Sequence, residues 1–126
     1  MLFDTDVIIW ALRGSRKAVT MIDLASNRFV SAVTWMELIK GVRDKAELRS
    51  VKGFLLDLGF EILPISEAIS HRATIYMEEF SLGAGMDLAD ALIAATATER
   101  ALKLCTGNNK HYRAIPELTM VVFRPE

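Results

Sequence analysis

Short apolar segments typical of strands alternate along this chain with stretches of helical length. Strands are expected at residues 2–3, 28–33, 60–65, 101–106 and 119–123. Helices are expected at residues 15–27, 45–58, 66–82 and 87–101, and a further helical pattern follows the first strand directly. Strands that are separated by helices usually pair in parallel. The alternation therefore predicts an α/β fold with a central, mainly parallel sheet of four to five strands.

Length and composition favour one domain over residues 1–126. The chain is 52% hydrophobic, so one core can bury roughly two thirds of the unfolded surface. No run is long enough to span a bilayer and no secretory signal is recognised, so we expect a cytoplasmic protein. The single cysteine, Cys105, falls in a predicted strand, which favours a packing role. Because the formal net charge is −1, any contact with nucleic acid must be local.

Polar side chains follow the ends of the predicted strands. Asp4 ends the first strand, Asp90 opens a predicted helix, and Asn108 follows the strand of residues 101–106. The carboxyl ends of parallel strands meet at one edge of the sheet, where sites form in open α/β folds. Carboxylate oxygens are the ligands that Mg²⁺ and Mn²⁺ prefer. The sequence therefore predicts a divalent-metal site at this edge.

The residue types leave two interpretations open for Asp4. A lone Asp after a strand usually caps the helix that follows, and Asp6 shares that task here. An Asp held at the edge of a central strand is also a rigid oxygen ligand for a hard cation.

Glu37 also has a local explanation. It lies three residues after Thr34, the spacing of a capping box, so we expect it in the first turn of a helix. Its neighbours Trp35, Met36 and Leu38 are apolar, and a carboxylate among them is costly unless it is paired or bound to a metal. The sequence does not decide between the two roles.

The remaining polar candidates come from two segments. Asp87 and Asp90 share one face at a helix start, where like charges repel unless a cation lies between them, although acids there also complement the helix dipole. The small side chains of residues 91–97 allow close packing on the sheet, which favours Asp90 as a ligand over Asp87. For Asn108 and His111 a solvated turn is the commoner outcome, but an Asn oxygen can also face a metal or water.

Four motifs, in this order, resemble a PIN domain, and most closely the compact ribonuclease toxins of bacterial VapBC-type toxin–antitoxin pairs. They are D-T-D-V-I-I from Asp4, T-x-x-E-L-x-x-G from Thr34, D-A-L-I-A-A-T-A from Asp90 and T-x-N-x-K-H-Y from Thr106. The resemblance implies a three-layer α/β/α PIN-like fold, an acidic cluster that binds Mg²⁺ or Mn²⁺, and hydrolysis of RNA phosphodiester bonds. It also implies a small antitoxin partner laid in a hydrophobic groove, and a homodimer.

The resemblance assigns roles to individual residues. The family's acids fall on Asp4, Glu37 and Asp90, while Asn108 stands where many relatives have a fourth acid. This departure leaves Asp6 or Asp87 to supply the missing charge. The predicted catalytic and metal-binding residues are Asp4, Glu37, Asp90, Asn108 and Asp87, with Asp6, Thr106 and His111 in support. Cations that could hold the RNA backbone are Arg13, Arg16, Lys17, Lys40, Arg43 and Lys110 with His111.

Two other functions stay open. The strand followed by D-T-D-V also opens haloacid-dehalogenase-type phosphohydrolases, in which Asp4 would be the nucleophile and Asp6 the acid/base, but the later motifs of that class are poorly met. Asn108 keeps open a non-catalytic PIN-fold binding module, which a metal titration would separate from an enzyme.

Overall fold

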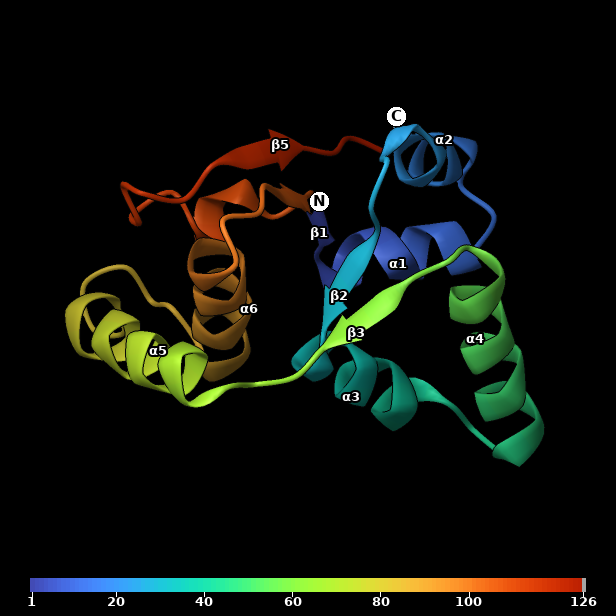
Figure 1. Cartoon of the computed structure of the whole chain (residues 1–126), viewed down its shortest axis with the longest axis horizontal. Helices are drawn as coiled ribbons and strands as arrows, with labels where there is room; N and C mark the ends of the chain where they lie inside the picture. Colours follow the sequence, from blue (N-terminus) through green and yellow to red (C-terminus); the bar gives the residue numbers. More distant parts are fainter. Residues whose placement is uncertain (126) are drawn as a thin grey trace.

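The computed structural model describes residues 1–125, and five short parallel strands form its central layer (Figure 1). The strands are β1 (Leu2–Phe3), β2 (Phe29–Ser31), β3 (Glu61–Leu63), β4 (Leu104–Thr106) and β5 (Met120–Val122). Their order is β3-β2-β1-β4-β5, and all neighbours pair in parallel. The predicted α/β fold with a parallel sheet is confirmed, with five strands.

Helices cover both faces of this sheet. They are α1 (Thr5–Leu12), α2 (Arg16–Leu24), α3 (Ala32–Gly41), α4 (Lys45–Asp57), α5 (Glu67–Phe80) and α6 (Leu88–Glu99), with a 3-10 turn at Asn109–His111. Figure 1 shows α5 and α6 on one side of the strands and α1, α2 and α4 on the other. In the part of the chain that the structure describes, no helix is long and apolar enough to cross a membrane.

Two hydrophobic cores follow from the alternation of side chains along each strand. Leu2 and Leu104 pack with α5 and α6, whereas the next residues, Phe3 and Cys105, pack with α1, α2 and α4. Successive strand residues point to opposite faces, so each strand feeds both cores. The three-layer arrangement is therefore built into the strands, and the packing role predicted for Cys105 is confirmed, since it is fully buried.

The central strand β1 places the first acid. β1 lies between β2 and β4, with Leu2 and Phe3 completely buried, and the chain leaves the sheet at Asp4. The backbone N–H of Asp4 still donates to the carbonyl of Cys105 at 2.9 Å, which fixes its position against β4. The strand order turns outward in both directions from β1, and such a switch point leaves a crevice at the carboxyl edge.

One helix begins earlier than the sequence predicts. Ser31 is the N-cap of α3, and its hydroxyl accepts a hydrogen bond from the backbone N–H of Val33 at 3.1 Å. Thr34 is therefore buried inside the first turn, and Glu37 lies in the second turn. The capping-box interpretation is wrong because β2 ends at Ser31, and Ser caps a helix as well as Thr does.

Candidate metal centre

Asp4 is buried at the carboxyl end of β1, with only 5% of its surface exposed. Its Oδ1 accepts from the backbone N–H of Thr5 at 2.8 Å, so it does cap α1. Its Oδ2 accepts from the hydroxyl of Thr106 at 2.7 Å and lies 3.0 Å from the hydroxyl of Tyr112. Burial raises the pKa of Asp4, and the hydrogen bond from Thr106 is the strongest opposing effect. Capping and rigid placement at the sheet edge are thus combined in one side chain.

Tyr112 joins two of the predicted acids. Its hydroxyl lies 3.0 Å from Asp4 Oδ2 and 3.2 Å from Asp90 Oδ1, and the side chain is completely buried. A phenol has one proton to donate, so it satisfies one carboxylate at a time. Burial, followed by the charges of Asp4 and Asp90, raises the pKa of Tyr112. No role was predicted for Tyr112 from the sequence, where its only signal is its place in the T-x-N-x-K-H-Y motif.

Asp90 enters the cluster from the first turn of α6. Asp87 is the N-cap of this helix, and its carboxylate accepts from the backbone N–H of Asp90 at 2.9 Å. The other oxygen of Asp90 lies 3.3 Å from Nδ1 of His111. Burial raises the pKa of Asp90 to about 6, and the nearby charge of Asp87 adds to the increase. The completely buried Ala91, Ala94 and Ala95 bring α6 close to the sheet, as the small-residue run predicted.

Asp6 also lies against the cluster, held by the backbone of residue 107. Its Oδ2 accepts from the N–H of Gly107 at 2.9 Å, while its Oδ1 is buried without a hydrogen-bond partner within residues 1–125. A Cβ at Gly107 would lie 2.6 Å from Asp6 Oδ2, so only glycine permits this approach. Burial and the charge of Asp4 raise the pKa of Asp6 to about 6.

Glu37 reaches the cluster through Thr5. The hydroxyl of Thr5 lies 2.6 Å from Glu37 Oε1 and 2.9 Å from the hydroxyl of Thr34. Glu37 itself is exposed, so the prediction that its carboxylate lies among apolar neighbours is wrong. The reason is the helix period, which turns Leu38 into the core and leaves Glu37 on the outer side of α3.

Asn108 is the least engaged of the predicted residues. It is exposed and precedes the 3-10 turn, where its side chain makes no capping hydrogen bond. Its backbone N–H donates to the hydroxyl of Thr106 at 2.9 Å, which helps to orient that hydroxyl toward Asp4. The backbone of Asn108 is thus linked to Asp4 through Thr106, whereas a role for its side-chain amide stays a prediction.

The residues of the acid cluster, which are Asp4, Asp6, Glu37, Asp87 and Asp90, suit a divalent cation in their chemistry. Across residues 1–125, no three His, Cys, Asp or Glu side chains already converge as the ligands of a bound ion do. The cluster nevertheless has only hard oxygen donors, one buried oxygen without a partner, and acids with raised pKa values. A cation relieves both the repulsion and the unsatisfied oxygen.

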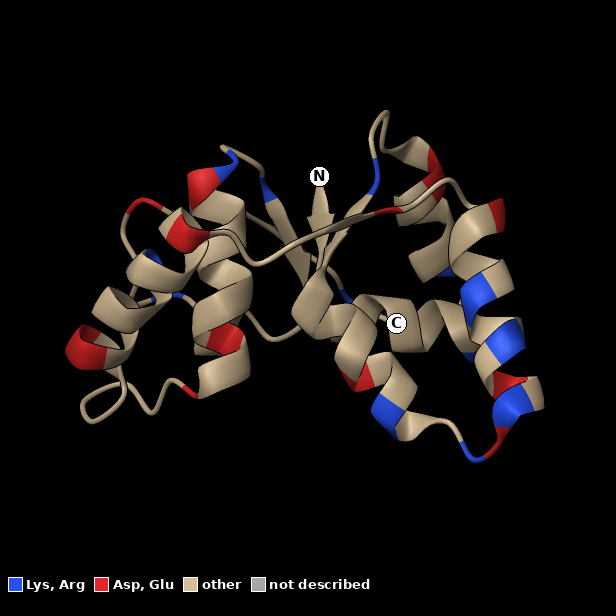
Figure 2. Cartoon of the chain, turned by 60° about the horizontal axis from the view of Figure 1, so that its bottom comes forward, with Lys and Arg blue, Asp and Glu red and all other residues tan. Residues whose placement is uncertain are grey.

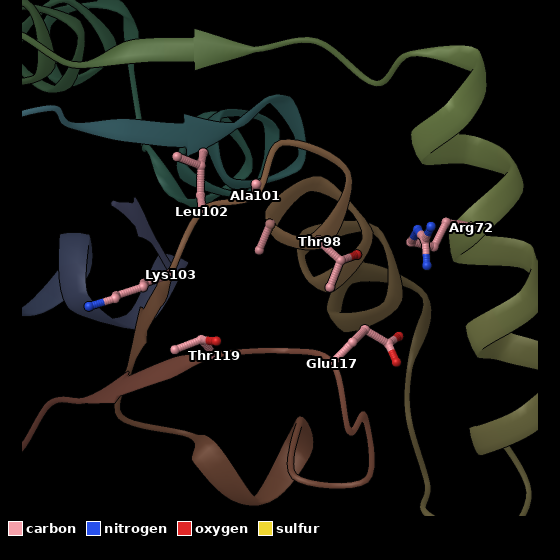
Figure 3. A pocket seen from close by; sticks show the side chains of 8 residues that line it. Arg72, Thr98, Ala101, Leu102, Lys103, Glu117 and Thr119 are labelled. Atoms are coloured by element: carbon pink, nitrogen blue, oxygen red, sulfur yellow. The ribbon is translucent and has the colours of Figure 1, made fainter.

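A separate hollow lies at the opposite, amino-terminal edge of the sheet (Figure 3). It has a volume of about 580 Å³, and its lining includes Arg72, Thr98, Lys103, Glu117 and Thr119. No residue of the acid cluster lines it. The hollow and the candidate metal centre are therefore distinct regions of the molecule.

Comparison with known proteins identifies relatives over nearly the whole chain. The family model described as PIN domain matches residues 1–117. The chain is similar to Ribonuclease VapC10 of Mycobacterium tuberculosis, with 35% identity over 122 residues, covering 94% of this chain and 90% of the relative.

Solved structures are also similar to this chain over nearly its whole length. A toxin–antitoxin complex from Klebsiella pneumoniae contains a chain with 30% identity and a TM-score of 0.78, matched over 99% of this chain and 97% of that chain. A DNA-bound VapBC from Salmonella typhimurium matches with a TM-score of 0.84 and 23% identity over 96% of each chain, which shows the shared fold.

Proposed function

This chain belongs to the PIN-domain family and is a VapC-type ribonuclease toxin, and we propose that Asp4, Asp90 and Glu37 hold the metal with which it hydrolyses RNA phosphodiester bonds. PIN ribonucleases generally use divalent metals, and the ion proposed here is Mg²⁺ or Mn²⁺. The observation that carries the proposal is the position of the Tyr112 hydroxyl between the buried Asp4 and the half-buried Asp90, with no Lys or Arg paired to either acid within residues 1–125.

The side chains of the cluster have separable tasks in this proposal. A bound metal supplies positive charge to the scissile phosphate and lowers the pKa of an attacking water. Asp4 is held by Thr5 and Thr106, so its carboxylate needs no reorganisation to receive a cation. Thr5 also holds Glu37, and Asp87 orients Asp90 by capping α6. No side chain is needed as nucleophile.

Asp6 is proposed as the residue that supplies the charge missing at Asn108. Its Oδ1 is buried without a partner, and its pKa is raised in part by the charge of Asp4, so the two carboxylates affect each other. A cation near Asp4 would therefore be stabilised by Asp6 as well. Manganese affinity, measured by calorimetry, should fall in Asp6→Asn. It should rise in Asn108→Asp if the amide faces the ion and should not change if residue 108 only forms a turn.

We also propose that a small antitoxin inhibits the chain, since its structural neighbours include toxin–antitoxin complexes. A hollow of about 280 Å³ between α1, α3 and α4 supports a peptide-binding groove next to the cluster. Ile9, Leu12, Leu38 and Val51 give it apolar walls, and Glu37 lies at its border. A homodimer is proposed from the family, and exposed apolar side chains such as Met36 and Leu88 are available for it.

Family membership favours the nuclease over the haloacid-dehalogenase interpretation of Asp4 and Asp6. The non-catalytic module is tested by the following experiment. Asp4→Asn should abolish metal-dependent cleavage of a structured RNA while the protein still folds, because Asn caps α1 as well as Asp does but lacks the charge. Asp57→Asn, which removes an exposed acid at the end of α4, is the matched control and should cleave normally. Full activity of Asp4→Asn would reject the assignment.

A further inference from the structure

We propose that single-stranded RNA reaches the acid cluster across one surface, the Trp10 patch, formed by Trp10, Arg13, Arg16, Lys17 and Arg124. The inference rests on the proposed ribonuclease function and adds where the substrate lies. In this arrangement the cations bind the phosphate backbone, and Trp10 stacks on a base close to the bond that is cut.

The five residues come from three parts of the chain but lie together. One hollow of about 330 Å³ is lined by Trp10, Arg13, Arg16 and Lys17 together with Pro125. Arg16 and Lys17 also line a second hollow of about 330 Å³, together with Arg124. The hollows share their wall, so the Trp10 patch is one continuous surface.

This surface lies next to the acid cluster along the chain. Trp10 lies one turn after Asp6 on the same face of α1, about 6 Å along the helix axis. On the other side, the backbone N–H of Phe123 donates to the carbonyl of Thr106 at 2.8 Å, so Arg124 follows from the same sheet edge that carries the cluster. A strand of RNA on the patch would therefore have its next phosphate near Asp4 and Asp6.

Within residues 1–125, no carboxylate neutralises the charges of the Trp10 patch. Arg13, Arg16, Lys17 and Arg124 are all exposed, and in residues 1–125 none of their side chains pairs with a carboxylate. The only acid of α2, Asp23, lies two turns beyond Arg16. Since the chain has a net charge of −1 and the cluster repels phosphate, RNA affinity must come from such a local group of free cations.

The other cations near the cluster are less suited to this role. Arg43 forms an ion pair with Glu47 at 2.9 Å, and His111 contacts Asp90. Figure 2 shows a further row of cations along α4, where Lys45, Arg49 and Lys52 lie, but none of these three residues lines the two hollows of the Trp10 patch. The α4 row is therefore a natural control surface.

The exposed indole of Trp10 favours RNA over an acidic peptide as the ligand of the patch. Val7, Ile8 and Ala11 bury the inner face of α1, whereas Trp10 is 38% exposed beside the cations. An indole next to a basic groove is the arrangement on which bases of single strands stack, with a contribution that does not depend on sequence. The catalytic edge also requires a phosphodiester at this place, which a peptide does not supply.

The test measures binding of a fluorescein-labelled single-stranded RNA by anisotropy at several salt concentrations, in an Asp4→Asn background that leaves the RNA uncut. In Arg16→Gln/Lys17→Gln, the slope of log affinity against log salt should become shallower by about 1.4, because each lost phosphate contact removes about 0.7. Trp10→Ala should weaken binding about fivefold or more without changing that slope, and Trp10→Phe should retain most of the affinity.

The control is Arg49→Gln/Lys52→Gln, which removes the same charge from α4. Equal losses in this control would overturn the inference, since net charge alone would then explain the effect. Unchanged RNA affinity in the patch variants would overturn the inference as well.

Cleavage by the unsubstituted chain, measured separately, distinguishes the two proposals. If that chain cuts RNA and the patch variants bind normally, only the Trp10 patch fails. If it cuts no RNA although the patch variants lose affinity, the ribonuclease mechanism fails and the RNA-binding patch stands.

Discussion

Both edges of the sheet bring a tyrosine hydroxyl to a carboxylate, but the basic groups beside these acids differ. At the amino-terminal edge, Tyr76 lies 2.5 Å from Glu117, and Arg72 forms an ion pair with Glu99. At the carboxyl edge, Tyr112 lies between Asp4 and Asp90, and within residues 1–125 no Lys or Arg pairs with either. The amino-terminal edge therefore contains an Arg–carboxylate pair, whereas at the carboxyl edge we propose that a divalent cation supplies the positive charge.

The difference supports the proposal that the acids of the carboxyl edge bind a ligand, whereas the ion pair of the amino-terminal edge is structural. A cation that belongs to the chain itself, as Arg72 does beside Glu99, compensates a carboxylate without any ligand. Acids whose pKa values are raised by burial and mutual repulsion have no such compensation, and their arrangement costs stability unless a ligand offsets it.

The largest effect is expected on catalysis. Asp90→Asn should lower the rate of RNA cleavage at least about 100-fold, because it removes a carboxylate that would bind the cation. Glu117→Gln, at the other edge, should leave the rate unchanged. Both rates are measured on the same RNA with Mn²⁺ and with Mg²⁺. A comparable loss in both variants would mean that the two edges do not differ in function.

Metal addition should stabilise the protein through the carboxyl edge alone. At a metal concentration of about 100 times Kd, the free energy of unfolding should rise by about 2.7 kcal/mol. The increase should be absent in Asp4→Asn and present in Glu117→Gln. Thermal melts with and without each metal test this. A melting temperature that neither Mn²⁺ nor Mg²⁺ changes at millimolar concentration would support the non-catalytic module instead.

The pH dependence of the metal-free protein should reveal the uncompensated acids. The pKa of Asp6 rises from 3.8 to about 6 in the folded state, so the stability it contributes is present below pH 4 and is lost as the pH increases through 6. The loss should be on the order of 1 kcal/mol, since water screens a side chain that is only partly buried. Asp6→Asn should flatten the curve of unfolding free energy against pH, and a curve identical to that of the parent would contradict the assignment.

The smallest effect is expected at the compensated edge. Arg72→Gln breaks the ion pair with Glu99, in which both side chains are partly exposed, and should cost at most about 1 kcal/mol of stability. Metal affinity should not change. Chemical denaturation and calorimetry measure the two quantities, and a change in metal affinity would show that the edges are coupled through the sheet.

The sequence predicted the elements whose signals are local. The apolar pair before Asp4 and the small-residue run after Asp90 each specify a packing environment over a few residues, and both acids lie where this pattern predicts. Glu37 was expected in a first turn, but Ser31 and Thr34 are competing caps, and only the end of β2 decides between them.

The sequence could not predict contacts that the tertiary fold creates. Tyr112 follows a short irregular turn that has no hydrophobic period, so nothing local indicates that its ring is buried or that its hydroxyl meets Asp4. The same is true of Gly107, whose lack of a side chain matters only because Asp6 approaches it across the sheet edge. The acid cluster was therefore predicted in its members but not in the groups that hold them.

The central position of β1 also determines when the site can exist. The hydrogen bonds that orient Asp4 come from Thr106 and Tyr112, which lie 102 and 108 residues further along the chain. Contacts between such distant segments form late, after the intervening loops have closed. A chain that is still emerging from the ribosome therefore has its first acid from the start, but the surroundings that orient Asp4 are not assembled until residue 112 is available.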